Sequence, residues 1–337
     1  MRQEWWARIL IIFLLAIAIG IPAVGWWQRS QGIVIHGRMA ETGGWTPANL
    51  TVAAGQPLHL RLTSDDITHS FAIGQSDQPP VEVVPGEMTE VTLTFDQPGK
   101  YTFYCTRWCS VNHWRMRGTI EVTAPPAGGS DSSLEAARLP LYITLGLDID
   151  SDHRAEVLPV QIPSAQRGAV LVQALPAAYR SRVYYLAHTP VDLWKALRAE
   201  SSLQRLTDQN VWDLVAWVWQ SNTTPQELEV GQQLYAANCA ACHGEQGNGK
   251  GVFAEQLDQS ALDDHAGMQA GEMTVKPVDF TDPSPMLSAS PAYLQGKILR
   301  GGMGTGMPYW GPIFTENQTW ALVAYLWTFQ FDIEVKP

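Results

Sequence analysis

The stretch that decides the fold is Cys105-Thr-Arg-Trp-Cys109-Ser-Val-Asn-His113-Trp-Arg-Met116. It places two thiols, an imidazole and a thioether within twelve residues, a soft ligand set that selects copper over hard cations. A mononuclear blue-copper site takes one cysteine, two histidines and a weak axial methionine. The second cysteine is therefore informative, because two thiolates can bridge two copper ions. A further imidazole is required, and His69 in Thr68-His-Ser-Phe71 is the expected supplier.

The residues before this motif have the alternation of β-strands. Leu58-His-Leu-Arg-Leu62 and Val91-Thr-Leu-Thr-Phe95 alternate apolar and polar side chains with period two, as half-buried strands require. Pro85-Gly86 and Pro98-Gly99 are turn signals between such runs. We therefore expect a small all-β sandwich over residues 31–124.

The spacing C-x3-C-x3-H-x2-M after an upstream H-S-F resembles the binuclear copper A site of cytochrome oxidase subunit II, also found in nitrous oxide reductase. The similarity covers about residues 33–123 and implies a cupredoxin domain. It implies bridging thiolates, terminal imidazoles and weak axial ligands supplied, in that order, by Cys105 and Cys109, by His69 and His113, and by Met116 with the main-chain carbonyl of Arg107. Many oxidase subunits have a glutamate at the position of Arg107 that also helps bind magnesium, which an arginine cannot do. A Cys105–Cys109 disulfide is the alternative, since an oxidising compartment would permit it.

A second motif, Cys239-Ala-Ala-Cys242-His243, has the C-x-x-C-H spacing of c-type haem attachment. Two thiols one helical turn apart can add to the two haem vinyl groups, with the adjacent imidazole beneath the iron as proximal ligand. A helix is expected before the motif, over residues 226–238, and another from Thr315, where Thr315 and Gln318 fit a capping box.

The sixth iron ligand is expected from a glycine-rich loop, Gly301-Gly-Met303-Gly-Thr-Gly-Met307-Pro-Tyr-Trp310. The Met-Pro pair resembles the axial-ligand motif of class I cytochromes c, which favours Met307 over Met303. Together, residues 226–337 resemble a bacterial all-α class I cytochrome c. This segment has 13 Asp and Glu against 5 Lys and Arg, an acidic surface that is able to steer a basic soluble cytochrome c towards it.

A bridging segment, residues 125–225, joins these two domains. Its start, Ala124-Pro-Pro-Ala-Gly-Gly-Ser-Asp-Ser-Ser133, is a linker by composition. Residues 207–219 match residues 315–327 at a constant offset of 108, with six of thirteen positions identical. The segment is therefore either a degenerate copy of the following domain without its cofactor motif, or a mixed spacer with two ordinary amphipathic helices.

The N-terminal residues 1–30 read as a membrane anchor. Ile9 to Val24 is an apolar run without charge, bracketed by Trp5-Trp6 and Trp26-Trp27. The Trp pairs are spaced by about the thickness of a hydrocarbon core, roughly 30 Å. A cleaved signal peptide is the alternative. In both cases the rest of the chain is expected on the extracytoplasmic face of the cell membrane.

The formal net charge of −11 argues against nucleic-acid binding. Anchor, copper A domain and fused cytochrome c, in this order, resemble subunit II of haem–copper oxidases. The resemblance implies a non-catalytic electron-entry subunit, which passes electrons from a donor such as soluble cytochrome c, through covalent haem c and copper A, to a catalytic subunit I that reduces dioxygen. The equivalent subunit of a copper A-containing nitric oxide reductase is the alternative.

Overall fold

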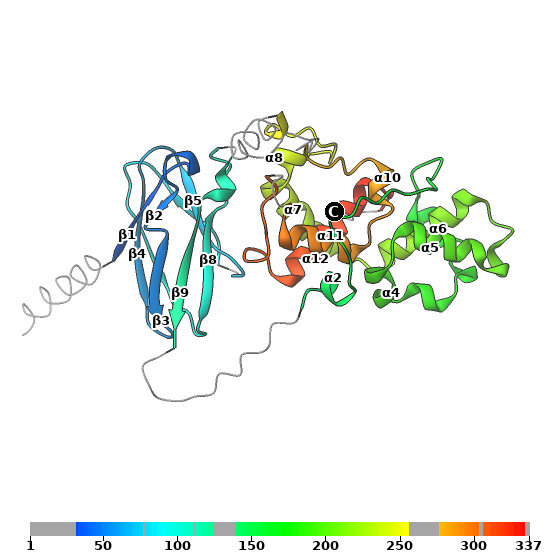
Figure 1. The fold of residues 1–337 in the computed structure, drawn as a ribbon, viewed down its shortest axis with the longest axis horizontal. Helices are drawn as coiled ribbons and strands as arrows, with labels where there is room; N and C mark the ends of the chain where they lie inside the picture. The colour runs from blue at the N-terminus through cyan, green and yellow to red at the C-terminus, as the bar shows by residue number, and fades with distance from the viewer. Residues whose placement is uncertain are drawn as a thin grey trace, which may run out of the picture. The chain divides into compact units, whose positions relative to one another are not determined.

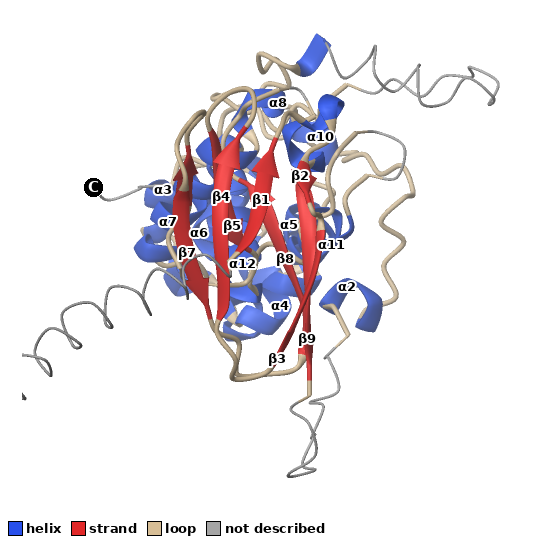
Figure 2. Cartoon of the chain, turned by 90° about the vertical axis from the view of Figure 1, so that its left-hand side faces the viewer, coloured by secondary structure: helices blue, strands red, loops and turns tan. Residues whose placement is uncertain are grey.

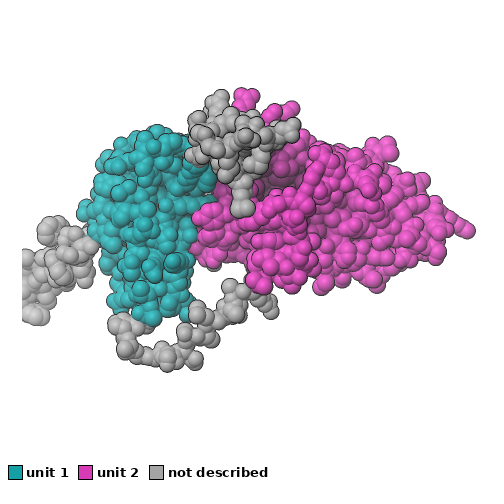
Figure 3. Space-filling model, viewed as in Figure 1, with its two compact units in different colours: residues 1–73, 78–130 teal, residues 74–77, 131–337 magenta. Residues whose placement is uncertain are grey.

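The computed structural model describes residues 32–76, 78–110, 112–124, 139–255, 276–302 and 306–333. The chain divides into two compact units, one of residues 1–73 and 78–130 and one of residues 74–77 and 131–337 (Figure 3). Among the described residues, the strands of both sheets lie in the first unit and the α-helices lie in the second (Figures 1 and 2).

One sheet of the first unit has four strands in the order β2-β1-β4-β7. Its strands are β1 (Ile33–Gly37), β2 (Trp45–Thr46), β4 (Leu58–Ser64) and β7 (Thr89–Leu93). β1 runs parallel to β4, whereas β7 is antiparallel to β4. The alternation expected at residues 58–62 is confirmed, since the three leucines are buried and His59 is exposed. β7 ends at Leu93, two residues before the expected end, although Phe95 is still buried.

The other sheet has five strands in the order β3-β9-β8-β5-β6. These are β3 (Asn49–Ala53), β5 (His69–Ile73), β6 (Val81–Val83), β8 (Gly99–Cys105) and β9 (Arg117–Thr123). β5 and β8 are antiparallel, with Phe71 opposite Cys105. This register brings the start of β5, at His69, to the same end of the sheet as the last residue of β8.

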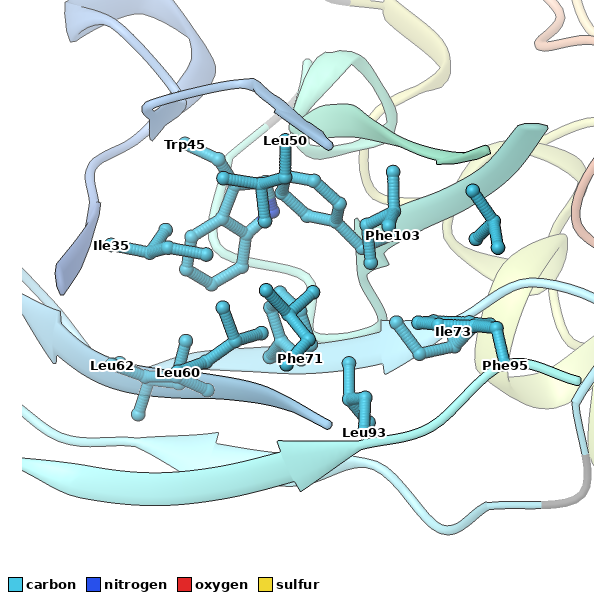
Figure 4. Close-up of a cluster of buried hydrophobic side chains, with 14 of the residues drawn as sticks. Ile35, Trp45, Leu50, Leu60, Leu62, Phe71, Ile73, Leu93, Phe95 and Phe103 are labelled. Carbon is cyan, nitrogen blue, oxygen red and sulfur yellow. The ribbon is translucent and has the colours of Figure 1, made fainter. Parts of the chain in front are cut away.

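The two sheets share one apolar core, which Figure 4 shows in close-up. Leu60 and Leu62 come from the four-stranded sheet, and Phe71 and Phe103 from the five-stranded sheet. The rings of Phe71 and Phe103 stack with centroids 5.2 Å apart, and Trp45 meets Phe71 edge-on at 5.5 Å. Packed aromatic pairs of this kind stabilise the fold by more than the burial of their apolar area alone. The expected all-β sandwich is confirmed.

The described part of the bridging segment lies in the second unit and is helical. Its elements are α2 (Leu141–Thr144), α3 (Ala165–Ala169), η3 (Val172–Ala174), η4 (Ala177–Arg180), α4 (Arg182–Ala187), α5 (Pro190–Ala199), η5 (Ser201–Leu203) and α6 (Asp208–Ser221). A capping box starts α5 at Thr189 and another starts α6 at Thr207. Each box satisfies backbone N–H groups that the first helical turn leaves unpaired.

The rest of the second unit contains the C-x-x-C-H motif. Its elements are α7 (Pro225–Asn238), α8 (Ala240–His243), α10 (Pro283–Met286), α11 (Pro291–Arg300), α12 (Glu316–Leu326) and η6 (Trp327–Phe329). The helix expected before the motif is confirmed as α7, which buries Leu228 and Tyr235. The capping box expected at Thr315 is also confirmed, because Gln318 N donates to Thr315 Oγ1 at 3.2 Å and Gln318 Oε1 accepts from Thr315 N at 2.8 Å.

The anchor expected over residues 1–30 lies outside the described residues. Within the part of the chain that is described, none of the helices has the length and apolarity needed to cross a bilayer.

Candidate metal centres

Three predicted copper ligands meet at one end of the sandwich. His69 begins β5, Cys105 ends β8 and Cys109 lies in the loop that follows. One donor atom from each lies within 4.8 Å of the other two. Both cysteines are free thiols in the structure. Two sulfurs and one imidazole at these distances fit a soft metal such as copper.

The two predicted weak ligands lie beside the sulfur atoms. Cys109 Sγ is 3.5 Å from Met116 Sδ, and Met116 is fully buried just before β9. Cys105 Sγ is 3.4 Å from the carbonyl oxygen of Arg107, which also accepts the Cys109 N–H at 2.8 Å. The loop therefore presents a thioether to one sulfur and a main-chain carbonyl to the other.

The Arg107 side chain makes a different contact from the Arg107 carbonyl. Its Nη1 donates to Glu82 Oε1 at 2.8 Å, and both side chains are more than half exposed. A surface pair of this kind stabilises by at most about 1 kcal/mol. The side chain thus holds the loop against β6 and leaves the carbonyl on the sulfur side.

The two imidazoles are buried and incompletely hydrogen-bonded. His69 Nε2 lies 2.7 Å from Asp66 Oδ1, while its Nδ1 has no hydrogen-bond partner. His113, in η2 (His113–Arg115), lies with its ring 3.9 Å from that of Trp108, and neither ring nitrogen has a partner. Because buried polar atoms normally have partners, these nitrogens fit a role as metal ligands.

The protonation of the thiols suits a shared site. The Cys109 thiol, with His113 and His69 nearby, lowers the pKa of Cys105 despite its burial. The pKa of Cys109 is raised, because a second thiolate beside Cys105 would be buried next to a like charge. Burial alone would lower the pKa of His69, but Cys105 and the Asp66 carboxylate raise it overall. Of the two thiols, Cys105 is therefore the one that loses its proton more readily.

The predicted haem-attachment residues follow α7 directly. Cys239 is the C-cap of α7, and α8 carries Cys242 and His243. His243 Nδ1 lies 3.1 Å from the carbonyl oxygen of Val278, which fixes Nδ1 as the donor and leaves Nε2 available for a metal. Phe280 stacks on the imidazole with centroids 4.6 Å apart. Burial lowers the pKa of His243, which favours the neutral form that binds iron.

Both thiols of this motif are retained as thiols. Burial raises the pKa of Cys242 to about 11 and that of Cys239 to about 12. The backbone around them is tight, since a Cβ on Gly251 would lie 2.2 Å from the carbonyl oxygen of Ala241. Two thiols and an oriented imidazole on one turn fit the donor set of a covalently held haem.

Met307 lies in the loop between α11 and α12 and is partly buried. Its carbonyl oxygen accepts the N–H of Gly302 at 3.2 Å, and Gly301 adopts a φ of +72° where a Cβ would lie 2.7 Å from that oxygen. The loop is thereby closed on itself. Met303 lies outside the described residues, and the role of Met307 as an iron ligand stays a prediction.

Models of two known protein families match two separate segments of the chain. A model of the cupredoxin-like domain matches residues 14–122, and a model of subunit III of cbb3-type cytochrome c oxidase matches residues 226–326. A heme-copper terminal oxidase structure matches with 19% identity over 36% of this chain and 99% of its own, at a TM-score of 0.24.

Two curated relatives are cytochrome c oxidase subunit 2 from Thermus thermophilus, each 37% identical over 104 residues, or 29% of this chain. The match spans 76% of the length of the first relative and 61% of the length of the second. The described β domain is thus a cupredoxin-like domain, and the helical region after residue 225 is a cytochrome c region. Given that identity and coverage, the chain belongs to the cytochrome c oxidase subunit 2 family.

Proposed function

We propose that this chain is the electron-entry subunit of a membrane haem–copper terminal oxidase. It would pass electrons from a donor to a catalytic subunit I that reduces dioxygen, without being catalytic itself. The observation that carries the proposal is the buried His69, Cys105 and Cys109 cluster, in a chain that also has the Cys239 to His243 motif on a helical turn.

For the copper site, the thiolates of Cys105 and Cys109 and the imidazoles of His69 and His113 would hold the two copper ions. Met116 and the Arg107 carbonyl would serve as weak ligands, in line with their 3.5 Å and 3.4 Å distances from the sulfurs. A pair of copper ions held here supplies one-electron exchange with little change in bonding. The chain holds these side chains in a packed interior and excludes water from them, because His69, Cys105, His113 and Met116 are each at most 2% exposed.

For the haem site, Cys239 and Cys242 would hold the haem covalently, and His243 and Met307 would supply ligands to its iron. A haem bound there supplies a second one-electron carrier. The chain orients the His243 ring at its edge, through the Val278 carbonyl, and on one face, through the Phe280 ring.

The setting of the subunit follows from the anchor expected over residues 1–30. The chain would cross the cell membrane once, with both metal domains on the extracytoplasmic face next to subunit I. The acidic cytochrome segment would attract a basic soluble cytochrome c. The choice between dioxygen and nitric oxide as the final acceptor would be made by the catalytic partner subunit.

The experiment is oxygen uptake by the tagged, detergent-purified complex, driven by reduced cytochrome c. Rapid, cyanide-sensitive uptake is expected. Negligible oxygen uptake with rapid nitric oxide consumption, by a complex that retains copper and haem, would overturn the oxidase proposal and assign the chain to a nitric oxide reductase.

A further inference from the structure

Two helices of the bridging segment have counterparts in the cytochrome region. α5 and α11 each have ten residues, and each begins at the proline that follows its N-cap, in the pairs Thr189-Pro190 and Ser290-Pro291. α6 and α12 both start at capping boxes, at Thr207 and Thr315, which is the offset of 108 seen in the sequence match. Similar pairs of helices are common in unrelated proteins, so a duplicated domain requires that the helices also pack in the same way.

The crossing of α7 with α12 has a distinctive packing feature. Gly231 of α7 lies directly against α12, because a Cβ there would be 2.1 Å from the carbonyl oxygen of Ala321 and 2.8 Å from Cβ of Tyr325. Only glycine permits this approach, so the contact is a sensitive marker of the crossing geometry.

The crossing of α3 with α6 has the same marker. A Cβ on Gly168 would be 2.0 Å from the carbonyl oxygen of Asp213 and 2.9 Å from Cβ of Trp217. At the offset of 108, Asp213 and Trp217 are the counterparts of the two α12 residues that face Gly231. The same glycine-mediated crossing therefore occurs twice in this unit.

The haem-attachment turn also has a counterpart. Gly168 precedes Gly231 by 63 residues, and the same offset aligns η4 with α8. Pro176-Ala-Ala-Tyr179-Arg180 then stands where Cys239-Ala-Ala-Cys242-His243 stands. The Arg180 guanidinium donates to the carbonyl oxygens of Val172 and Leu175, so it closes its own turn.

The segments that would enclose a haem are shortened in the bridging segment. Residues 181–189 separate η4 from α5, whereas residues 244–290 separate α8 from α11. The counterpart of the loop with Met307 is residues 200–207, which contain no methionine. Neither attachment thiols nor an axial pair is present there.

We propose that residues 164–222, called here the haemless copy, form a second cytochrome c-like domain that packs on the haem domain as an internal pseudo-twofold partner. Trp219 and Trp327 are counterparts at the offset of 108, and their rings meet edge-on with centroids 5.6 Å apart. Both are at most 1% exposed. In a twofold pair, the residues that contact their own counterparts are those at the axis.

This contact places the haemless copy behind the segment that orients His243. Trp327 begins η6, and Phe329 at its end stacks on Phe280 with centroids 6.3 Å apart. Gln330 Nε2 also donates to the carbonyl oxygen of Phe280 at 2.6 Å. The haemless copy therefore braces the Phe280 ring that lies on His243, a consequence that rests on the proposed haem role of His243.

The test is hydrogen–deuterium exchange of the full chain carrying Trp219→Phe, with Trp212→Phe as control. Trp212 is on the same helix, is 1% exposed and has a similarly unpaired Nε1, but its ring stacks on Trp194 within the haemless copy. Trp219→Phe should speed exchange of the amides of residues 327–331 at least about tenfold. The control should leave those amides unchanged. Equal exchange of residues 327–331 in both variants would overturn the interface.

Gly168→Ala tests the duplicated fold separately. A helix position without close packing is more stable with alanine than with glycine. A variant whose unfolding temperature is raised or unchanged would therefore overturn the duplicated crossing. A lowered unfolding temperature, matched by Gly231→Ala, is expected. Neither readout requires copper, haem or oxygen uptake, so a failure here is distinct from a failure of the proposed function.

Discussion

Asp66 accepts a hydrogen bond from Nε2 of His69 at 2.7 Å, and this contact fixes which nitrogen of the buried imidazole faces the thiols. The carboxylate is itself held by the backbone N–H groups of Met39 at 2.7 Å and Ile67 at 2.6 Å. His69 is therefore held in one orientation before any metal binds, with Nε2 directed at Asp66. Such outer partners of ligating histidines raise their basicity as ligands.

Asp66→Asn should weaken copper binding by roughly 10-fold to 100-fold, because the charge that supports the His69 ring is lost. Competition with a copper chelator measures the change. Asp65→Asn is the matched control, since Asp65 pairs with His36 and Arg38 on the surface and contacts no predicted ligand. An Asp66 variant with the affinity of the Asp65 variant would remove Asp66 from the site.

Cys109→Ser should abolish the copper A optical bands and leave the haem spectrum intact, because a hydroxyl does not replace a bridging thiolate. Visible absorption of the purified full chain measures both chromophores in one sample. Cys242→Ser is the reciprocal control and should alter only the haem. Copper A bands that persist in the Cys109 variant would refute the bridge.

Asp150 links the bridging segment to α11 and predicts an acid dependence of stability. Its hydrogen bond from Arg300, with Lys297 Nζ at 3.6 Å, lowers the pKa of Asp150 to about 2 from an ordinary 3.8. A carboxyl with a lowered pKa stabilises the fold above its ordinary pKa, and this contribution is lost as the pH falls towards about 2.

Asp150→Asn should therefore lower the stability near neutral pH by less than about 1 kcal/mol, because the Asp150 side chain is 56% exposed. It should also flatten the loss of stability between about pH 4 and pH 2. Thermal unfolding against pH gives both quantities. Asp152→Asn is the control, since Asp152 is exposed and 3.6 Å from Arg154. Parallel pH profiles for both variants would contradict the assignment.

The local parts of both centres could be predicted from the sequence. Cys105, Cys109, His113 and Met116 lie within one loop and its flanks, and Cys239 to His243 form one turn, so their spacing alone is enough to predict a chemistry for each centre. The strand alternation at residues 58–62 was equally local and is confirmed.

The supporting contacts could not be predicted, because they depend on tertiary structure. Val278 and Phe280 reach His243 from more than thirty residues away, with no motif of their own. Asp66 is close in sequence to His69, but the hydrogen bond between them depends on the conformation of the turn before β5. The turn at Pro176 to Arg180 has lost each chemical residue of its counterpart, so only the glycine crossing identifies it.

Met303 and Met307 share one glycine-rich loop, and a direct test separates them as iron ligands. The Gly302 N–H to Met307 carbonyl contact holds Met307 at the closed base of that loop. Met307→Ala should open the reduced haem to carbon monoxide, which a six-coordinate iron excludes, whereas Met303→Ala should not. The carbon monoxide difference spectrum of each purified variant measures this. If the two variants exchange roles, Met303 is the ligand; if neither binds carbon monoxide, the sixth ligand lies outside this loop.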